Sequence, residues 1–394
     1  MSEMSTVAPQ EQVDEWLRSL GLQYDPFRAL NAGEDNHLHE YLINAKAFQE
    51  IYNDSVSFSF APAGGGKSAL RVRLARACRV GENGRRLFPI VYVLPQDVVA
   101  RHGEPLRQAH VRAILRAAAF ELLLRLAYRP HEFLTLDAAG QRLIHSLLEA
   151  DLPMPLPHLL AQLETPADLR ETARLYDPTA NWPNAPDSDT LREFGDALCE
   201  TLTLQAPTSP MQRLATWLEA LFQVLKFEAV YLLLDGVDGY PETLTSPTEA
   251  LAVLAPLLQS AVEWSREKLF LKAFLPADLQ SPIRASYPHL TSLAYFDKID
   301  WKPEDTRELL NRRMEAAWGM APASVNMLGT PELDRLDQDL TDAGLTSPRD
   351  VLAAVEQILF AHVGRTGPTG KLTPNDVAIG LKQYRVNSRR AAST

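Results

Sequence analysis

The chain has 394 residues, 46% of them hydrophobic and 23% charged, as in globular proteins with a core large enough for two domains. Its formal net charge of −11 argues against broad binding to nucleic-acid backbones but allows a local basic patch. Two cysteines are too few for a disulfide framework, and no run of about 18 apolar residues could span a membrane. Met1 to Gln12 lacks the basic-then-apolar order of a secretory signal, so we expect a cytoplasmic protein.

The first hundred residues predict a helix, a turn and a phosphate-loop arrangement. Apolar residues recur at helical spacing from Glu11 to Leu20, and Asp25-Pro26-Phe27 has the composition of a turn. The alternating segment from Ser55 to Phe60 predicts a strand, which is followed by three glycines and a helical pattern from Ser68 to Cys78. Strand, glycine loop and helix are thus in the order that phosphate binding requires.

The middle of the chain predicts a helical insertion between two buried strands. Ile90 to Leu94 is a short apolar run of the buried-strand type. From about 97 to 212 the spacing is mostly helical with proline-rich breaks. Ala229 to Leu234 is a continuous apolar run that ends in Asp235, as expected of a central parallel strand.

The last third changes from strands to helices. Leu269 to Leu275 predicts a strand, and Leu293 to Phe296 a weaker one. Helical patterns then cover Pro303 to Trp318, Pro331 to Leu340 and Pro348 to His362. The basic, polar tail from Arg385 to Thr394 is expected to be unstructured.

These elements predict a three-layer α/β fold with a parallel sheet of about five strands. We expect a leader and helix over 1–24 and a core over 25–300, with the insertion at about 97–212 between the second and third strands. A helical lid and a tail would occupy 301–394.

The strongest chemical signal is the glycine-rich segment that leads into the predicted helix from Ser68 to Cys78. It comprises Ala61, Pro62, Ala63, Gly64, Gly65, Gly66, Lys67, Ser68 and Ala69. It departs from the Walker A pattern because Ala61 replaces the first glycine. The glycines leave backbone N–H groups free for phosphate oxygens, and the helix N-terminus adds a positive dipole end. Lys67 would reach the β- and γ-phosphates of a nucleoside triphosphate, and Ser68 would ligate Mg²⁺; the alternative is an incidental glycine-rich turn.

A second candidate segment is Leu-Leu-Leu-Asp-Gly-Val-Asp at 232–238. A carboxylate at the tip of a buried strand beside the phosphate loop lies where Mg²⁺ needs negative charge, so Asp235 is the expected metal ligand. Asp238 is the candidate for polarising the attacking water or for supporting the metal ligands from behind, with Glu242 as a weaker competitor. The alternative is an ordinary Asp-Gly turn.

Together, 61–68 and 232–238 resemble the P-loop ATPases of the AAA+ and STAND (NACHT-like) groups. The chain departs from both, because Gly236 stands where AAA+ proteins carry glutamate and Gly239 where the STAND pattern has an acidic residue. Asp25-Pro26-Phe27 resembles the strap before the phosphate loop in origin-recognition-like ATPases.

Thr346-Ser347-Pro348-Arg349-Asp350 resembles the sensor 2 segment of the same group. The resemblance implies that Arg349 approaches the γ-phosphate from the lid; the alternative is a solvated arginine. Lys272, in the strand that corresponds to sensor 1, would meet a phosphate or lie at the sheet edge. Arg284 is a candidate finger for a neighbour's nucleotide, against a simple surface arginine. A basic helix face, formed by Arg71, Arg73, Arg76 and Arg79, is expected to be solvated; the alternative is contact with an acidic partner.

The resemblance implies a molecular switch that binds ATP with Mg²⁺ and hydrolyses it, in a regulatory, defence or DNA-associated complex. Its partners would be further copies of itself or other protein subunits; DNA is possible but is not indicated by the charge. The glycines at 236 and 239 favour an alternative, a nucleotide-binding scaffold with little or no hydrolysis. A third hypothesis is an origin-recognition-like DNA-loading ATPase, which needs a winged-helix-like C-terminus; Lys371 to Tyr384 is the candidate stretch. The absence of a guanine-specifying Asn-Lys-x-Asp motif favours ATP.

Overall fold

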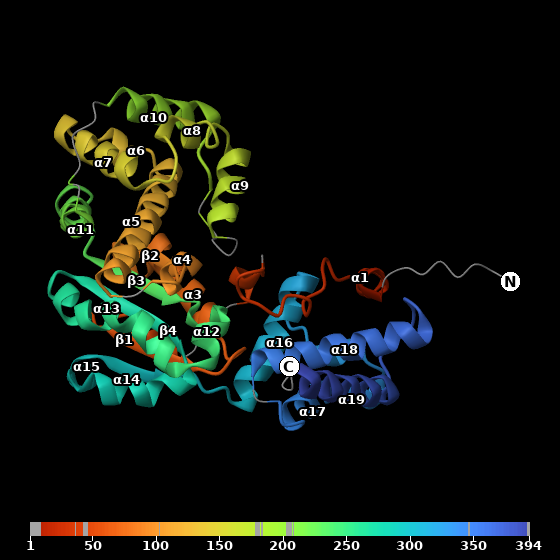
Figure 1. Cartoon of the computed structure of the whole chain (residues 1–394). Helices are drawn as coiled ribbons and strands as arrows, with labels where there is room; N and C mark the ends of the chain where they lie inside the picture. The colour runs from red at the N-terminus through yellow and green to blue at the C-terminus, as the bar shows by residue number, and fades with distance from the viewer. Residues whose placement is uncertain are drawn as a thin grey trace. The chain divides into compact units, whose positions relative to one another are not determined.

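The computed structural model describes residues 9–35, 37–41, 46–101, 103–177, 182, 184–201, 207, 209–345 and 347–391 (Figure 1). Tertiary contacts divide the chain into two compact units. The α/β unit comprises 45–63 and 67–299, and the helical unit comprises 1–44, 64–66 and 300–394. The predicted division at residues 24 and 300 stays a prediction. No helix in the described part of the chain is long and apolar enough to cross a membrane.

The α/β unit is built on a parallel sheet, which in the described residues has five strands in the order β2-β3-β4-β1-β5. The strands are β1 (Ser57–Ala61), β2 (Leu87–Val93), β3 (Ala229–Asp235), β4 (Leu269–Pro276) and β5 (Tyr295–Lys298). Each pairing is parallel, so all carboxyl ends lie at one edge of the sheet. The continuous apolar runs of β3 and β4 reflect burial on both faces. The prediction of an α/β fold with about five parallel strands is confirmed.

Helices cover both faces of this sheet. On one face Leu232 and its neighbours join an apolar core with α5 (Gly103–Tyr128) and α13 (Pro247–Arg266). On the opposite face, α3 (Lys67–Val80) packs against β2, β3 and β4. The arrangement is compatible with the predicted three layers.

The segment between β2 and β3 is helical, as predicted. Its helices are α4 (Gln96–Val99), α5, α6 (His131–Leu134), α7 (Ala138–Asp151), α8 (Leu156–Leu160), α9 (Pro166–Tyr176), α10 (Ser188–Glu200) and α11 (Pro210–Glu219), which runs into a π-helical turn, η3 (Ala220–Val224). A buried cation ties this segment to α3: Arg79 bonds Glu121 of α5 at 2.7 Å and Asp177 at 3.0 Å. The prediction of a solvated basic face is therefore wrong for Arg79, because two carboxylates from the insertion enclose it.

Short helices complete both units. They are α2 (Lys46–Ile51), α12 (Pro241–Thr245), α14 (Gln280–Ser286), α15 (Pro288–Leu293), η1 (Leu38–Glu40), η2 (Glu82–Gly84), η4 (Val237–Gly239), η5 (Ala277–Leu279), η6 (Val325–Leu328) and η7 (Pro331–Leu333). The predicted helix at Pro331 to Leu340 is thus a 3₁₀ turn followed by a separate α-helix.

The helical unit has its own apolar core. Its α-helices are α1 (Pro9–Ser19), α16 (Pro303–Trp318), α17 (Leu336–Asp342), α18 (Pro348–Thr366) and α19 (Pro374–Ala391). The prediction of an unstructured tail is wrong from Arg385 to Ala391, because α19 packs along α18 and continues to that residue. Residues 392–394 lie outside the described part of the chain.

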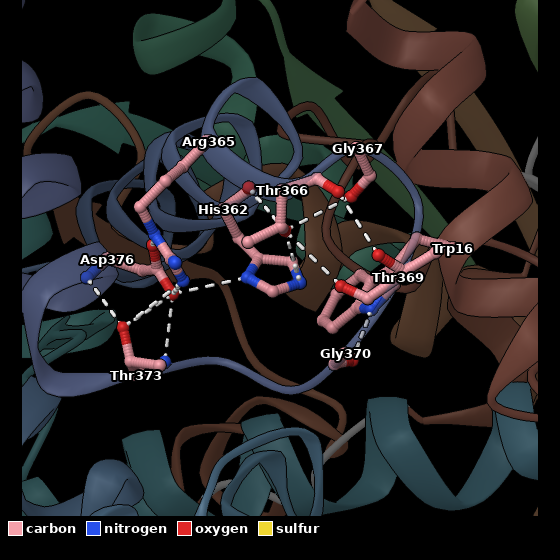
Figure 2. Close-up of polar contacts among 9 residues, drawn as sticks. All are labelled: Trp16, His362, Arg365, Thr366, Gly367, Thr369, Gly370, Thr373 and Asp376. Atoms are coloured by element: carbon pink, nitrogen blue, oxygen red, sulfur yellow. Dashed lines mark hydrogen bonds and ion pairs between the residues drawn. The ribbon is translucent and has the colours of Figure 1, made fainter.

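A buried polar cluster joins α1, α18 and α19 (Figure 2). The Asp376 carboxylate accepts hydrogen bonds from Arg365 at 2.7 Å and from Thr373, and lies 3.1 Å from His362 Nδ1. The Trp16 ring packs on His362 with 4.6 Å between ring centroids. Burial alone would raise the pKa of Asp376, but these hydrogen bonds hold it well below the usual range. Asp376 is therefore a charged anchor for the start of α19.

Candidate nucleotide-binding site

The buried ammonium group of Lys67 is the centre of the candidate site. Lys67 begins α3 directly after the glycine loop, and it is 5% exposed. Its Nζ donates to the carbonyl oxygens of Ala61 and Pro62 at 3.1 Å each and lies 3.0 Å from Asp238 Oδ2. The structure thus brings two of the predicted catalytic residues together at the carboxyl edge of the sheet. A phosphate oxygen would compete with Asp238 for the same ammonium group.

The predicted metal ligand Asp235 is already paired. It ends β3, and its Oδ2 lies 3.2 Å from Nε of Arg71, one helical turn after Lys67. Its Oδ1 accepts the backbone N–H of Gly236 at 2.8 Å. Both side chains of the ion pair are more than nine-tenths buried, with 6% and 7% exposed. Arg71, which was expected on a solvated face, therefore neutralises the carboxylate proposed for Mg²⁺.

Arg71 carries a further unsatisfied polar group. Its Nη1 is buried and has no hydrogen-bond partner in the described part of the chain. A buried donor without a partner costs free energy, and a ligand oxygen would relieve that cost. One sequence signal could have identified Arg71: it lies four residues after Lys67 and hence on the same face of the helix.

The glycine after Asp235 is required by the backbone. Gly236 has φ +80°, and a Cβ there would lie 2.8 Å from Cγ1 of Val93. The glutamate of the AAA+ pattern cannot be accommodated at this position without a backbone change. Gly239 has open space around it, so its lack of a carboxylate has no steric cause in the described residues. Glu242 is exposed in the first turn of α12, and its role stays a prediction.

The loop glycines make close contacts within the helical unit. Gly64 has φ +76°, and a Cβ there would lie 2.6 Å from Cβ of Arg349. Gly66 has φ +90°, with a Cβ position 3.2 Å from the ring of Trp301, and the Trp301 indole N–H donates to the Gly65 carbonyl at 3.0 Å. The positive φ disfavours a side chain at both 64 and 66, and at 64 a Cβ would also clash with Arg349. The sequence shows no signal for Trp301.

Arg349, the predicted sensor 2 residue, lies in the first turn of α18. Its Nη2 donates to Oδ1 of Asn31 at 2.7 Å. Ser347 caps the same helix by accepting the Asp350 N–H at 3.2 Å. Thr346 lies outside the described residues. Whether Arg349 contacts a phosphate stays a prediction.

Of the remaining predicted residues around the loop, only Ser68 has a side-chain oxygen for a metal ion. Ser68 and Ala69 are half-buried in the first turn of α3, and Ala63 is exposed. Within the described residues there is no cluster of three or more His, Cys, Asp or Glu side chains that could hold a metal. Mg²⁺ typically binds through one or two protein oxygens plus substrate phosphates. Ser68 and Asp235 would supply those oxygens once Arg71 is displaced.

Lys272 differs from both interpretations of its role. It is fully buried in β4, and its Nζ donates to the carbonyls of Ile51, Asn53 and Ser55 at 2.7, 2.8 and 2.7 Å. These residues precede β1, so Lys272 points to the amino edge of the sheet, opposite to the carboxyl edge where Lys67 lies. Burial lowers the pKa of Lys272 to about 7. It is a structural lysine that neither meets a phosphate nor reaches solvent.

Arg284 is exposed and lies over the Phe296 ring, 4.9 Å from its centroid. Its role toward a neighbouring copy stays a prediction.

Comparisons with known proteins do not place this chain in a family. No protein-family model, curated protein or solved structure matches this chain.

Proposed function

We propose that this protein is an ATP-binding molecular switch that depends on Mg²⁺. The observation that carries the proposal is the buried Lys67 ammonium at the junction of glycine loop and helix, held by two loop carbonyls and Asp238. A lysine ammonium pays a large desolvation penalty when buried, so its retention at a phosphate-loop position favours an anionic ligand.

Binding would exchange partners at two places. The β- and γ-phosphates would replace Asp238 on Lys67, and Mg²⁺ would replace Arg71 on Asp235. Asp238 would then be free to orient a water molecule, and Arg71 to contact phosphate oxygens through its unpaired Nη1. Two such arrangements of the same side chains are what a ligand-driven switch requires.

A nucleotide-binding scaffold with little hydrolysis is the second candidate. It is favoured by Gly236, where the backbone excludes the glutamate that would activate water, and by the ion pair on Asp235. The DNA-loading hypothesis has less support, because 374–391 is one continuous helix where a winged-helix wing would need paired strands. Self-assembly and association with other subunits remain part of the proposal.

The deciding experiment is equilibrium binding of a fluorescent ATP analogue, followed by phosphate release, with and without Mg²⁺. We expect Lys67→Ala to weaken binding by about tenfold or more, because it removes the cation for the phosphates. Lys226→Ala, an exposed lysine of the same unit, is the matched control and should bind as the wild type does.

The outcomes separate the candidates. Binding with Mg²⁺-dependent release supports the ATPase, and binding without release supports the scaffold. If the wild type does not bind ATP, or if Lys67→Ala binds equally well, the proposed site is wrong.

A further inference from the structure

The edge strand β2 has an open side near its carboxyl end. In the described residues β2 pairs with β3 alone. Its first half is buried, but Val91 is half-buried and Val93 is 53% exposed. Pro89, which lacks an N–H, stands in the covered half, where it blocks pairing with a further strand.

The backbone polar groups of Val91 and Val93 face this open side. The N–H of Leu94 donates to the Asp235 carbonyl of β3 at 2.9 Å. Because backbone groups alternate between the two sides of a strand, Tyr92 also faces β3 whereas Val91 and Val93 face away. In the part of the chain that the structure describes, neither outward N–H has a hydrogen-bond partner. Exposed edges of this kind are templates for an added strand.

An apolar groove adjoins the open edge. It has a volume of about 490 Å³ and lies between the end of β2 and one face of α5. Its floor is formed by small side chains at helical spacing, namely Ala109, Ala113 and Ala117. One end is closed by Phe120, stacked on Tyr176 with ring centroids 5.3 Å apart. The groove therefore accepts small or branched apolar side chains of an extended chain.

The groove is flanked by positive charge. Arg112 and Arg116, one turn apart on α5, line it and are exposed. Among the described residues neither makes an ion pair, in a chain whose net charge is −11. A third arginine, Arg101, and one acidic residue, Asp97, also line the groove, so three arginines stand against one carboxylate there.

We propose that this groove is a docking site for an extended, acidic segment of a partner protein. The segment would add to β2 through the backbone of Val91 and Val93 and turn every second side chain toward α5. On that one face, apolar side chains would lie over the alanines and carboxylates would meet Arg112 and Arg116. Symmetric pairing with β2 of a second copy is disfavoured, because it would bring the same two arginines of each copy together. The site is separate from the nucleotide proposal and does not depend on it.

The test measures fluorescence anisotropy with synthetic probes on the full chain. The probe is a fluorescein-labelled ten-residue peptide in which valine and glutamate take turns at every second position and threonine fills the positions between, compared with its lysine counterpart. Two further glutamate peptides are N-methylated, one at the valine and glutamate amides and one at the threonine amides, because these two sets point to opposite sides of the strand. We expect the glutamate peptide to bind, the lysine peptide to bind at least about tenfold more weakly, and at least one methylated peptide to lose about tenfold.

Matched variants separate the groove from general charge. R112E/R116E should weaken the glutamate peptide by about tenfold or more and improve the lysine peptide. R170E/R174E, two exposed arginines one turn apart on α9 that do not line the groove, should change binding less than about twofold. The proposal is overturned if the glutamate peptide does not bind at 1 mM peptide, if both charge forms bind equally, or if neither methylation weakens binding. Because methylation changes only the probe, that comparison holds even if a variant fails to fold.

Discussion

Replacing Arg71 with methionine should make the stability of the α/β unit depend on magnesium. Methionine keeps most of the apolar stem of arginine but removes the charge, which leaves the buried Asp235 carboxylate without its cation. In the wild type Mg²⁺ must displace Arg71 to reach Asp235. In the variant it finds the carboxylate free, so the ion should bind more tightly.

The size of the effect follows from the burial of the pair. Removing one partner of a buried ion pair costs about 3–5 kcal/mol, and we take about 3 kcal/mol because Asp235 also accepts the Gly236 N–H. For a domain of this size that corresponds to a Tm lower by about 6–12 °C. If Mg²⁺ is present at about 100 times its dissociation constant, it restores about 2.7 kcal/mol.

Thermal unfolding in EDTA and in 10 mM MgCl₂ is the assay, with circular dichroism as the signal. Asp235→Asn and the double variant R71M/D235N complete the cycle. Both lack the carboxylate, so magnesium should not raise their Tm beyond the change seen in the wild type. Magnesium binding at Asp235 is refuted if magnesium raises the Tm of R71M and of R71M/D235N equally. The predicted cost of breaking the ion pair is refuted if R71M unfolds at the wild-type temperature.

Two other substitutions test the groups around the sheet. Asp238→Asn removes the carboxylate that competes with phosphate for Lys67, so ATP should bind several-fold more tightly while phosphate release slows. Weaker ATP binding in the same fluorescence titration would contradict the proposed exchange of partners on Lys67. Burial lowers the pKa of His110 from 6.5 to about 4, and its ring lies 2.7 Å from the Tyr92 hydroxyl and 2.8 Å from the Val253 carbonyl. The neutral form is the one favoured by folding, so this contribution is complete above pH 6.5 and is lost as pH falls toward about 4. Urea unfolding should therefore show about 2 kcal/mol less stability at pH 5 than at pH 7, and a shallower loss in His110→Gln; parallel pH profiles would refute the assignment.

The pattern of the sheet could be predicted from sequence because it depends on local periodicity. The uninterrupted apolar run of β3 is what a strand buried on both faces needs, and its end at Asp235 was identifiable. The glycine loop could also be predicted from the sequence, and the structure gives Gly64 and Gly66 the positive φ that such loops need. These features depend on residues within about ten positions of one another.

Charged residues inside the fold could not be predicted in the same way. Local spacing favours a solvated face for Arg71 and Arg79. In the structure both are paired with carboxylates from distant segments, namely Asp235, Glu121 and Asp177. Lys272 is satisfied by backbone carbonyls, which carry no sequence signal at all. Burial of a charge depends on tertiary partners, and no local pattern contains that information.

The two ion pairs at the carboxyl edge of the sheet have a joint consequence for ligand binding. Lys67 and Arg71 lie one turn apart on α3. Arg71 pairs with Asp235 at the end of β3, and Lys67 pairs with Asp238 in the turn that follows. If phosphate bound alone, it would displace the Asp238 carboxylate from Lys67, and this negative charge would then repel the phosphate. If Mg²⁺ bound alone, it would displace the Arg71 guanidinium from Asp235, and this positive charge would then repel the ion. Each ligand therefore supplies the charge that the other displaces, so metal and triphosphate should bind better together than either does alone. The same two ion pairs balance two acids against two bases at a largely buried position, which offsets the cost of burying four charges.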